Sequence, residues 1–201
     1  MTEKIKYAII GAGCMGQEHI LNIGIIDDAE VVALCDTSEQ SIQESLELLN
    51  DEVAIFHDYN DLIDANIADA FIIATPNFTH IDVLKDVMKS EVHLLIEKPL
   101  CTTVKDCQEF EKLAENYPGV IWTAMEYRYM PPVQRLINEI HNNTIGDLKM
   151  LSIREHRFPF LHKVDDWNRF AIKTGGTLVE KYCHFFDLMR LIAKSEPVKV
   201  Y

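Results

Sequence analysis

Lys98, Glu180 and His184 are the residues whose types and spacing could carry out acid–base chemistry. Lys98 closely follows an apolar run, so its ammonium group would stand at the end of a strand and could hydrogen-bond a reacting hydroxyl. Glu180 and His184 are four residues apart and would share one face of a helix. A carboxylate that orients an imidazole is a common way to prepare a general base near neutral pH. These three residues are therefore candidate catalytic groups.

Each candidate also has a simpler interpretation. A histidine among Phe and Leu residues is often a satisfied core residue, and a pair such as Glu97-Lys98 is often a solvated surface. Cys183-His184 could indicate a metal, but no second Cys/His pair completes a four-ligand set, so we predict no metal site. The catalytic interpretation gains weight from a cofactor motif elsewhere in the chain.

The cofactor motif is a glycine-rich turn that follows the apolar stretch Tyr7–Ile10. Gly11 allows a tight turn, Gly13 lets the backbone approach a pyrophosphate, and Gly16 lets a helix pack close to the sheet. The N-terminus of that helix offers free N–H groups to the phosphates. We therefore predict that a dinucleotide is bound here by Gly11, Gly13, Cys14, Met15 and Gly16.

Asp36 follows the predicted strand Val31–Cys35 and lies 20 residues after Gly16, where it could accept hydrogen bonds from both ribose hydroxyls. Its charge would repel a 2′-phosphate, and the next residues, Thr37-Ser38-Glu39, contain no Arg or Lys. We therefore predict NAD in preference to NADP. The alternative is that Asp36 only ends a strand or caps the next helix. The other cofactor-binding candidates are Thr37, Thr75, Pro76, Asn77, His80, Glu97 and Lys98.

Two sets of these candidates, the segment from Thr75 to His80 and the pair Glu97-Lys98, stand at the ends of predicted strands. The segment from Thr75 to His80 follows an apolar run, although an ordinary turn with a proline and an Asn cap would explain it equally well. Lys98-Pro99 is also a candidate cis peptide, because X–Pro bonds tolerate the cis form far better than other bonds do.

Strands and helices alternate over the first 123 residues, which predicts a doubly wound parallel sheet that binds ligands beyond the carboxyl ends of its strands. The predicted strands are Ile5–Ile10, Val31–Cys35, Ala70–Ala74, His93–Glu97 and Val120–Thr123, and the predicted helices are Met15–Ile25, Glu39–Leu49, Phe78–Lys89 and Val104–Asn116. We expect residues 1–123 to form the dinucleotide-binding domain.

The pattern changes after Thr123, and we expect residues 124–201 to form the start of a second, α/β domain. Its predicted elements are the helices Pro131–Asn142 and Thr177–Ala193 and the strands Leu148–Phe158 and Val198–Tyr201. One helix pair with one or two strands cannot close a second core, so this domain is expected to be truncated.

The composition excludes several classes of function. The 201 residues include 19 Lys+Arg against 32 Asp+Glu, a formal net charge of -13, which argues against nucleic-acid binding and against an anionic membrane surface. The five cysteines are odd in number and scattered, which indicates reduced thiols. No signal peptide or transmembrane run is found, so we expect a cytoplasmic protein.

Four motifs in order resemble the glucose–fructose oxidoreductase/inositol dehydrogenase (Gfo/Idh/MocA) family along the whole chain. They are the glycine turn with Asp36, the segment from Thr75 to His80, Glu97-Lys98-Pro99, and the Gly175-Gly176 helix that reaches His184. The resemblance implies a Rossmann domain followed by an open-faced α/β domain, with the substrate between them. It also implies oxidation of a secondary alcohol of a sugar, cyclitol or related polyol with NAD(P).

The resemblance also implies roles for single residues. Lys98 matches the family's catalytic lysine and His184 its catalytic histidine, while Glu180 stands where many members have Asp. Arg128 and the Trp167-Asn168-Arg169 segment fall where such proteins often line the substrate side, although a surface or interdomain contact is an equal alternative. Lys181 and Tyr182 replace the small residues often found at their positions.

Length is the main departure from the family pattern, because the chain corresponds to half to two-thirds of a usual member. The missing sheet often builds the oligomer interface in the family, so we expect a homo-oligomer for a full-length form. The alternative to an NAD-dependent dehydrogenase is a non-catalytic NAD-binding sensor or regulator, or an inactive truncated member.

Overall fold

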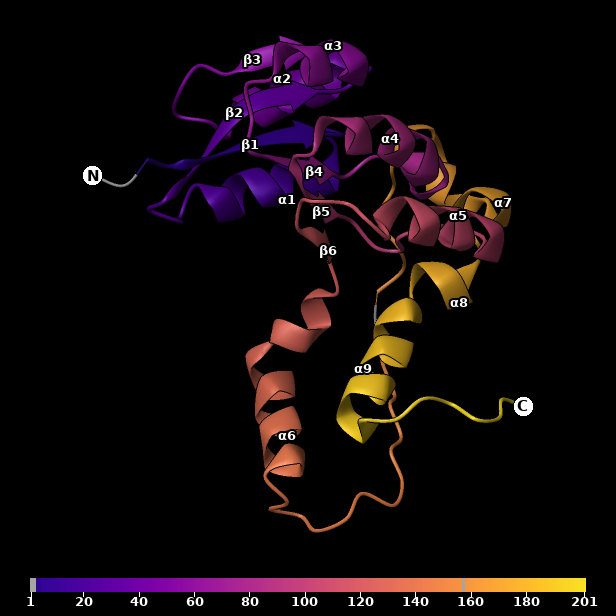
Figure 1. Ribbon diagram of the computed structural model, residues 1–201. Helices are drawn as coiled ribbons and strands as arrows, with labels where there is room; N and C mark the ends of the chain where they lie inside the picture. The colour runs from indigo at the N-terminus through magenta and orange to yellow at the C-terminus, as the bar shows by residue number, and fades with distance from the viewer. Residues whose placement is uncertain (1–2, 157) are drawn as a thin grey trace.

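The computed structural model describes residues 3–156 and 158–201 and contains a six-stranded parallel sheet with helices on both faces (Figure 1). The strand order is β3-β2-β1-β4-β5-β6, which confirms the predicted doubly wound fold. The strands are β1 (Ile5–Ile10), β2 (Ala29–Cys35), β3 (Ala54–Phe56), β4 (Ala70–Ile73), β5 (His93–Ile96) and β6 (Ile121–Thr123).

The side chains of β1 and β4 alternate between two hydrophobic clusters, one on each face of the sheet. On one face Ile9 and Ile72 pack with Ile20, and on the other Phe71 packs with Leu84. All four residues of β4 are buried, as expected for a central parallel strand. The helices of this layer are α1 (Cys14–Ile23), α2 (Glu39–Leu46), α3 (Tyr59–Ala65), α4 (His80–Val87) and α5 (Val104–Ala114), with 3-10 turns η1 (Asn77–Thr79) and η2 (Met88–Ser90).

The register of the central strands brings three loops to one edge of the sheet. Ile10 pairs with Ile73, and Ile73 pairs with Ile96, so β1, β4 and β5 end at the same level. The main chain continues this register for one more residue, since Ala74 N donates to Ile10 O over 2.8 Å and Glu97 N donates to Ile73 O over 2.9 Å. The glycine turn, the Thr75–His80 segment and Lys98 therefore lie together at the carboxyl edge, as predicted.

The chain beyond the sheet forms a second layer in which α6 and α9 lie side by side below the sheet (Figure 1). Ile137 of α6 packs against Leu188 and Ile192 of α9 in a small separate core. The elements of this part are η3 (Glu126–Tyr129), α6 (Pro131–His141), η4 (Val164–Arg169), α7 (Ala171–Thr174), α8 (Thr177–Glu180) and α9 (Cys183–Ala193).

Two predictions for the second layer are wrong. The expected single helix Thr177–Ala193 is interrupted at Lys181 and Tyr182, which separate α8 from α9. Lys181 has φ −112° at this break, and its buried side chain forms an ion pair with Glu155. The expected strands Leu148–Phe158 and Val198–Tyr201 do not form within the described residues. Leu148, Leu151 and Ile153 pack, partly buried, against the small core of α6 and α9, whereas Met150 is 85% accessible and Val198 and Tyr201 are fully exposed. Within the described residues no neighbouring strand supplies hydrogen bonds to either segment.

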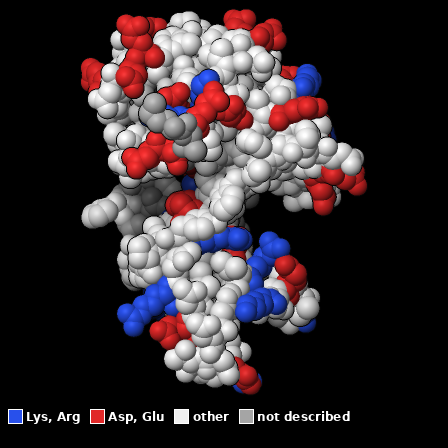
Figure 2. Space-filling model, turned by 60° about the vertical axis from the view of Figure 1, so that its left-hand side comes forward, with Lys and Arg blue, Asp and Glu red and all other residues white. Residues whose placement is uncertain are grey.

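Charge is divided between the two layers. Figure 2 shows carboxylates spread over the sheet layer and several Lys and Arg side chains on the layer below it. The first arginine of the chain is Arg128. A phosphate at the carboxyl edge of the sheet would therefore be held mainly by backbone N–H groups rather than by arginines. In the described part of the chain, no helix has the length and apolar character needed to cross a bilayer.

Candidate active site

The glycine turn between β1 and α1 has the geometry of a phosphate cradle. Gly11 adopts φ +102°, and a Cβ on it would lie 2.5 Å from the Ala74 carbonyl carbon. A Cβ on Gly16 would lie 2.1 Å from the Gly11 carbonyl oxygen, so only a glycine at this position lets the first turn of α1 pack this closely against the loop. In contrast, nothing lies within 4 Å of a Cβ built on Gly13. The turn is thus packed on its inner side and open at Gly13, beside the α1 N-terminus.

Asp36 is bound to this turn. Its Oδ2 accepts a hydrogen bond from Ala12 N at 2.7 Å, and its Oδ1 accepts one from Ser38 N at 2.8 Å. A carboxylate has about four lone-pair sites, so two remain for ribose hydroxyls. The cap of α2 is Ser38 rather than Asp36, since Ser41 N donates to the Ser38 hydroxyl. Thr37, between them, is exposed.

Hydrogen bonds within the Thr75–His80 segment fix its conformation. The Thr79 hydroxyl lies 2.9 Å from Thr75 Oγ1 and donates to the Pro76 carbonyl at 2.8 Å. Asn77 is buried, and its Nδ2 has no partner among the described residues, so this amide group is an unsatisfied donor that a bound ligand could satisfy. This orphaned donor and the open side of Gly13 both fit a dinucleotide.

His80 joins two of the loops at the carboxyl edge. Its side chain is 0% exposed, and its ring nitrogens lie 2.9 Å from the Thr75 carbonyl oxygen and 3.0 Å from that of Pro99. Burial lowers the pKa of this imidazole. His80 was predicted as a cofactor-binding residue, and its position indicates an indirect role, in which it holds the backbone around a cofactor.

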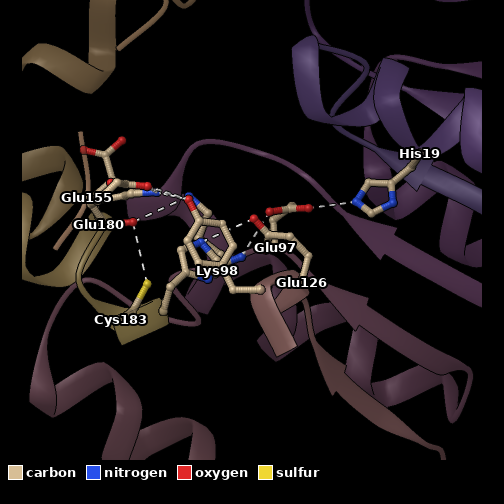
Figure 3. A network of polar contacts seen from close by, with 10 residues as sticks. His19, Glu97, Lys98, Glu126, Glu155, Glu180 and Cys183 are labelled. Carbon is tan, nitrogen blue, oxygen red and sulfur yellow. Dashed lines mark hydrogen bonds and ion pairs between the residues drawn. The ribbon is translucent and has the colours of Figure 1, made fainter. Parts of the chain in front are cut away.

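Lys98 stands at the end of β5 and is half-buried. Its peptide bond to Pro99 is cis, as predicted. Lys98 N donates to Glu97 Oε2 at 3.2 Å, and the other carboxylate oxygen of Glu97 lies 2.8 Å from His19 Nε2 of α1 (Figure 3). Glu97 is 6% exposed, so this buried carboxylate ties the Lys98 backbone to the first helix. The sequence analysis did not identify His19.

His184 is the second residue of α9 and is almost fully buried, with 1% of its surface exposed. Its ring stacks on Tyr127 with a centroid distance of 4.2 Å and an interplanar angle of 7°. Burial, with a smaller contribution from the nearby charges of Lys98 and Lys181, lowers the pKa of His184 to about 4. The structure therefore brings Lys98 and a neutral His184 to the same place.

The carboxylate beside His184 belongs to Glu126 and not to Glu180. Glu126 Oε1 lies 3.4 Å from His184 Nε2. The prediction that Glu180 and His184 share a helical face is wrong, because α8 ends at Glu180 and α9 starts at Cys183. The main-chain oxygen of Glu180 instead lies 3.5 Å from Lys98 Nζ and 3.6 Å from Cys183 Sγ (Figure 3).

Lys181 supports the ring that covers His184. Lys181 is 6% exposed, and its ammonium group lies 3.0 Å from Glu155 Oε1. The same group contacts the Tyr127 hydroxyl and lies 4.4 Å from the Tyr127 ring centroid, while that hydroxyl donates to Glu155 at 2.9 Å. This network fixes Tyr127 and thereby the plane of the imidazole.

The two predicted substrate-side residues are placed differently. Nε and Nη2 of Arg128 donate to the two carboxylate oxygens of Asp187 in α9, so Arg128 holds η3 against that helix. Trp167 packs edge-on against Phe78 of η1, with ring centroids 6.4 Å apart, and so lies beside the Thr75–His80 segment. Trp167 therefore remains near the cofactor loop, while Arg128 is engaged in an ion pair.

The lowered pKa of His184 predicts a pH-dependent stability. The unfolded chain binds a proton on this histidine near pH 6.5, whereas the folded chain does so only near pH 4, so the stabilisation is complete above pH 6.5 and is lost as the pH falls toward 4. We expect the wild-type protein to lose about 2 kcal/mol more than His184→Gln between pH 7 and pH 5 in urea unfolding. Equal losses in wild type and His184→Gln would contradict the burial of a neutral imidazole.

The sheet order, the glycine turn and Asp36 define a Rossmann-fold dinucleotide-binding protein. The chain belongs to the Gfo/Idh/MocA oxidoreductase family: the family's NAD-binding Rossmann fold matches residues 5–125, and its C-terminal alpha/beta domain matches residues 137–201.

Individual relatives agree with this assignment. The chain is 32% identical to an inositol 2-dehydrogenase of Pseudarthrobacter chlorophenolicus, over 100% of the chain and 57% of that protein. Its fold is similar to that of a myo-inositol 2-dehydrogenase from Lactobacillus plantarum (TM-score 0.81, 22% identity, 98% and 58% covered). It is also similar to the WlbA dehydrogenase from Bordetella pertussis in complex with NADH and UDP-GlcNAcA (TM-score 0.77, 21% identity, 94% and 58% covered). The chain thus spans less than three-fifths of the length of these relatives.

Proposed function

We propose that this protein is an NAD-dependent dehydrogenase that oxidises a secondary alcohol of a sugar, cyclitol or related polyol. The observation that carries the proposal is the meeting of Lys98 and the buried, neutral His184 at the carboxyl edge of the sheet, beside the open glycine turn. A sensor of the dinucleotide has no need of such a proton-transfer pair. The names of the inositol dehydrogenase relatives support the class of substrate.

The residues of the chain have separate tasks in this proposal. Gly11, Gly13 and the α1 N-terminus would hold the pyrophosphate, and Asp36 would accept from the ribose hydroxyls. The bound nicotinamide would supply the hydride acceptor. His184 would accept the proton of the substrate hydroxyl, while Lys98 would hydrogen-bond the same oxygen and stabilise its developing negative charge.

The remaining parts of the proposal rest on the sequence. We propose that the domains divide after Thr123, where β6 ends, and that Trp167 faces the substrate side. Scattered cysteines favour the cytoplasm, and a full-length form is proposed to be a homo-oligomer.

The test is to measure binding and turnover separately. We expect calorimetry to show that NAD⁺ binds at least about tenfold more tightly than NADP⁺, because Asp36 would repel a 2′-phosphate. Nicotinamide reduction, followed by absorbance, is expected with at least one member of a panel of cyclitols, aldoses and related polyols. Tighter binding of NADP⁺ would contradict the cofactor assignment. NAD⁺ binding without reduction by any alcohol would support the alternative, a non-catalytic sensor or regulator.

A further inference from the structure

Lys181 is a buried cation in the break between α8 and α9. A buried ammonium group is costly unless an opposite charge pairs with it. Glu155 supplies that charge, with its Oε1 3.0 Å from Lys181 Nζ and its side chain 25% exposed. The proposed hydride transfer gives this pair no task, although Lys181 lies close to His184.

One aromatic ring, that of Tyr127, connects the ion pair to His184. The ammonium group of Lys181 lies over this ring, 4.4 Å from its centroid, and the other side of the contact is the stacked imidazole of His184 at 4.2 Å. Glu155 instead meets the ring at its hydroxyl, which donates to the carboxylate at 2.9 Å. The pair therefore presents its cation, rather than its carboxylate, to the ring that covers His184.

Charged and titratable groups surround His184 from β5, η3 and α9. They are Glu97, Lys98, Glu126, Tyr127, Lys181, Cys183 and Asp187. Burial disfavours the imidazolium form most strongly, the two lysines disfavour it further, and the carboxylates favour it. In the proposed reaction the charge of Lys98 is offset by the developing alkoxide, so Lys181 is the lysine whose charge the substrate leaves unchanged.

We propose that Lys181 is a positioning residue for His184: its ammonium group holds the Tyr127 ring against the imidazole, and its charge favours the neutral imidazole. This inference rests on the proposed dehydrogenase function. Lys181 acts through Tyr127 and through its electric field, and it has no direct part in the transfer of hydride or proton. Because the neutral imidazole is the form that can accept a proton, Lys181 extends turnover toward lower pH.

The first test is an NMR titration of the His184 imidazole in the chain without substrate or cofactor. The wild type should titrate near pH 4. Lys181→Gln removes the charge and keeps a donor for Glu155, and it should move the titration upward by roughly half a pH unit to one unit. Lys181→Arg keeps the charge and should stay near the wild type. Lys181→Met, which keeps the length of the side chain, replaces Lys181→Gln if that variant does not fold.

The matched control is Lys85→Met, because Lys85 also pairs with a glutamate, at 3.1 Å from Glu109, but lies on α4 in the sheet layer. It should leave the titration of His184 unchanged. An unchanged titration in Lys181→Gln, or an equal shift in Lys85→Met, would overturn the proposal.

The second test is the pH dependence of kcat/KM. In Lys181→Gln the acidic limb should move to higher pH with the titration of His184, and Lys181→Arg should restore its position. A purely structural role would lower kcat/KM by the same factor at every pH, and that result would also overturn the proposal. If the wild-type chain turns over no alcohol, the proposed function fails, whereas the titration still supports or overturns the coupling of Lys181 to His184.

Discussion

Lys98→Ala is expected to lower the turnover of a polyol substrate by about a hundredfold to ten-thousandfold, because it removes the cation that would stabilise the developing alkoxide. The ammonium group stands at the end of β5, and its position is fixed by the buried Glu97–His19 pair and by the Glu180 main-chain oxygen. The measurement is kcat/KM in steady-state assays with the best alcohol of the panel. Lys98→Arg should recover little of the loss, since a guanidinium is larger and differently shaped.

Two controls separate catalysis from folding in this experiment. Lys105→Ala removes an exposed lysine of α5 and should leave turnover unchanged. Lys98→Ala should change the affinity for NAD⁺ far less than it changes turnover, because the glycine turn and Asp36 follow other strands, β1 and β2. Near-normal turnover of Lys98→Ala would rule out its catalytic role.

The sheet layer could be predicted from the sequence because its signals are local. The segment Ala70–Ile73 is apolar throughout and lies fully buried, and β1 was predicted with its exact bounds. The missed elements of this layer are short: β3 has three residues, and α3, which follows it, carries a broken apolar pattern. Such segments are ordered by neighbouring strands and helices rather than by their own periodicity.

The second layer was harder to predict because the helical spacing of its apolar residues continues across a break in the helix. The apolar pattern runs from Thr177 through Ala193, yet the helix breaks at Lys181 and Tyr182, where Lys181 is buried against Glu155, and the break separates Glu180 from His184. Alternating apolar residues at 148–158 indicated a strand, but a strand forms only where a partner supplies hydrogen bonds.

In the candidate site, too, some residues could be predicted from the local sequence and others only from the three-dimensional structure. Lys98 was identified from its place at a strand end, and His184 from its motif. Glu126, His19 and Tyr127 approach them only because η3 and α1 meet the sheet edge, and no spacing rule relates those positions. The partner of a catalytic group is thus the feature most dependent on the three-dimensional structure.

The glycine turn provides the second prediction with a large effect, since two of its glycines are required for different reasons. Gly11→Ala should destabilise the protein by about 3 kcal/mol, because the new Cβ meets the Ala74 backbone at 2.5 Å and the residue must keep φ +102°. The measurement is the free energy of unfolding in urea. The expected cost is high because the opposing atoms are main-chain atoms of the neighbouring strand end, which cannot turn away as a side chain could.

In contrast to Gly11→Ala, Gly13→Ala should weaken NAD⁺ binding and leave the stability of the protein nearly unchanged. Nothing lies within 4 Å of its new Cβ, and its backbone angles suit alanine, so stability should change by less than about 1 kcal/mol. The affinity for NAD⁺ should nevertheless fall more than about tenfold, because the methyl group would occupy the space through which a pyrophosphate approaches the α1 N-terminus.

A Gly13→Ala protein that binds NAD⁺ like the wild type would show that the open side of the turn is not the phosphate site. A Gly11→Ala protein of unchanged stability would show that the turn can relax away from β4. Together the two variants separate the glycine that the fold requires from the glycine that the ligand requires.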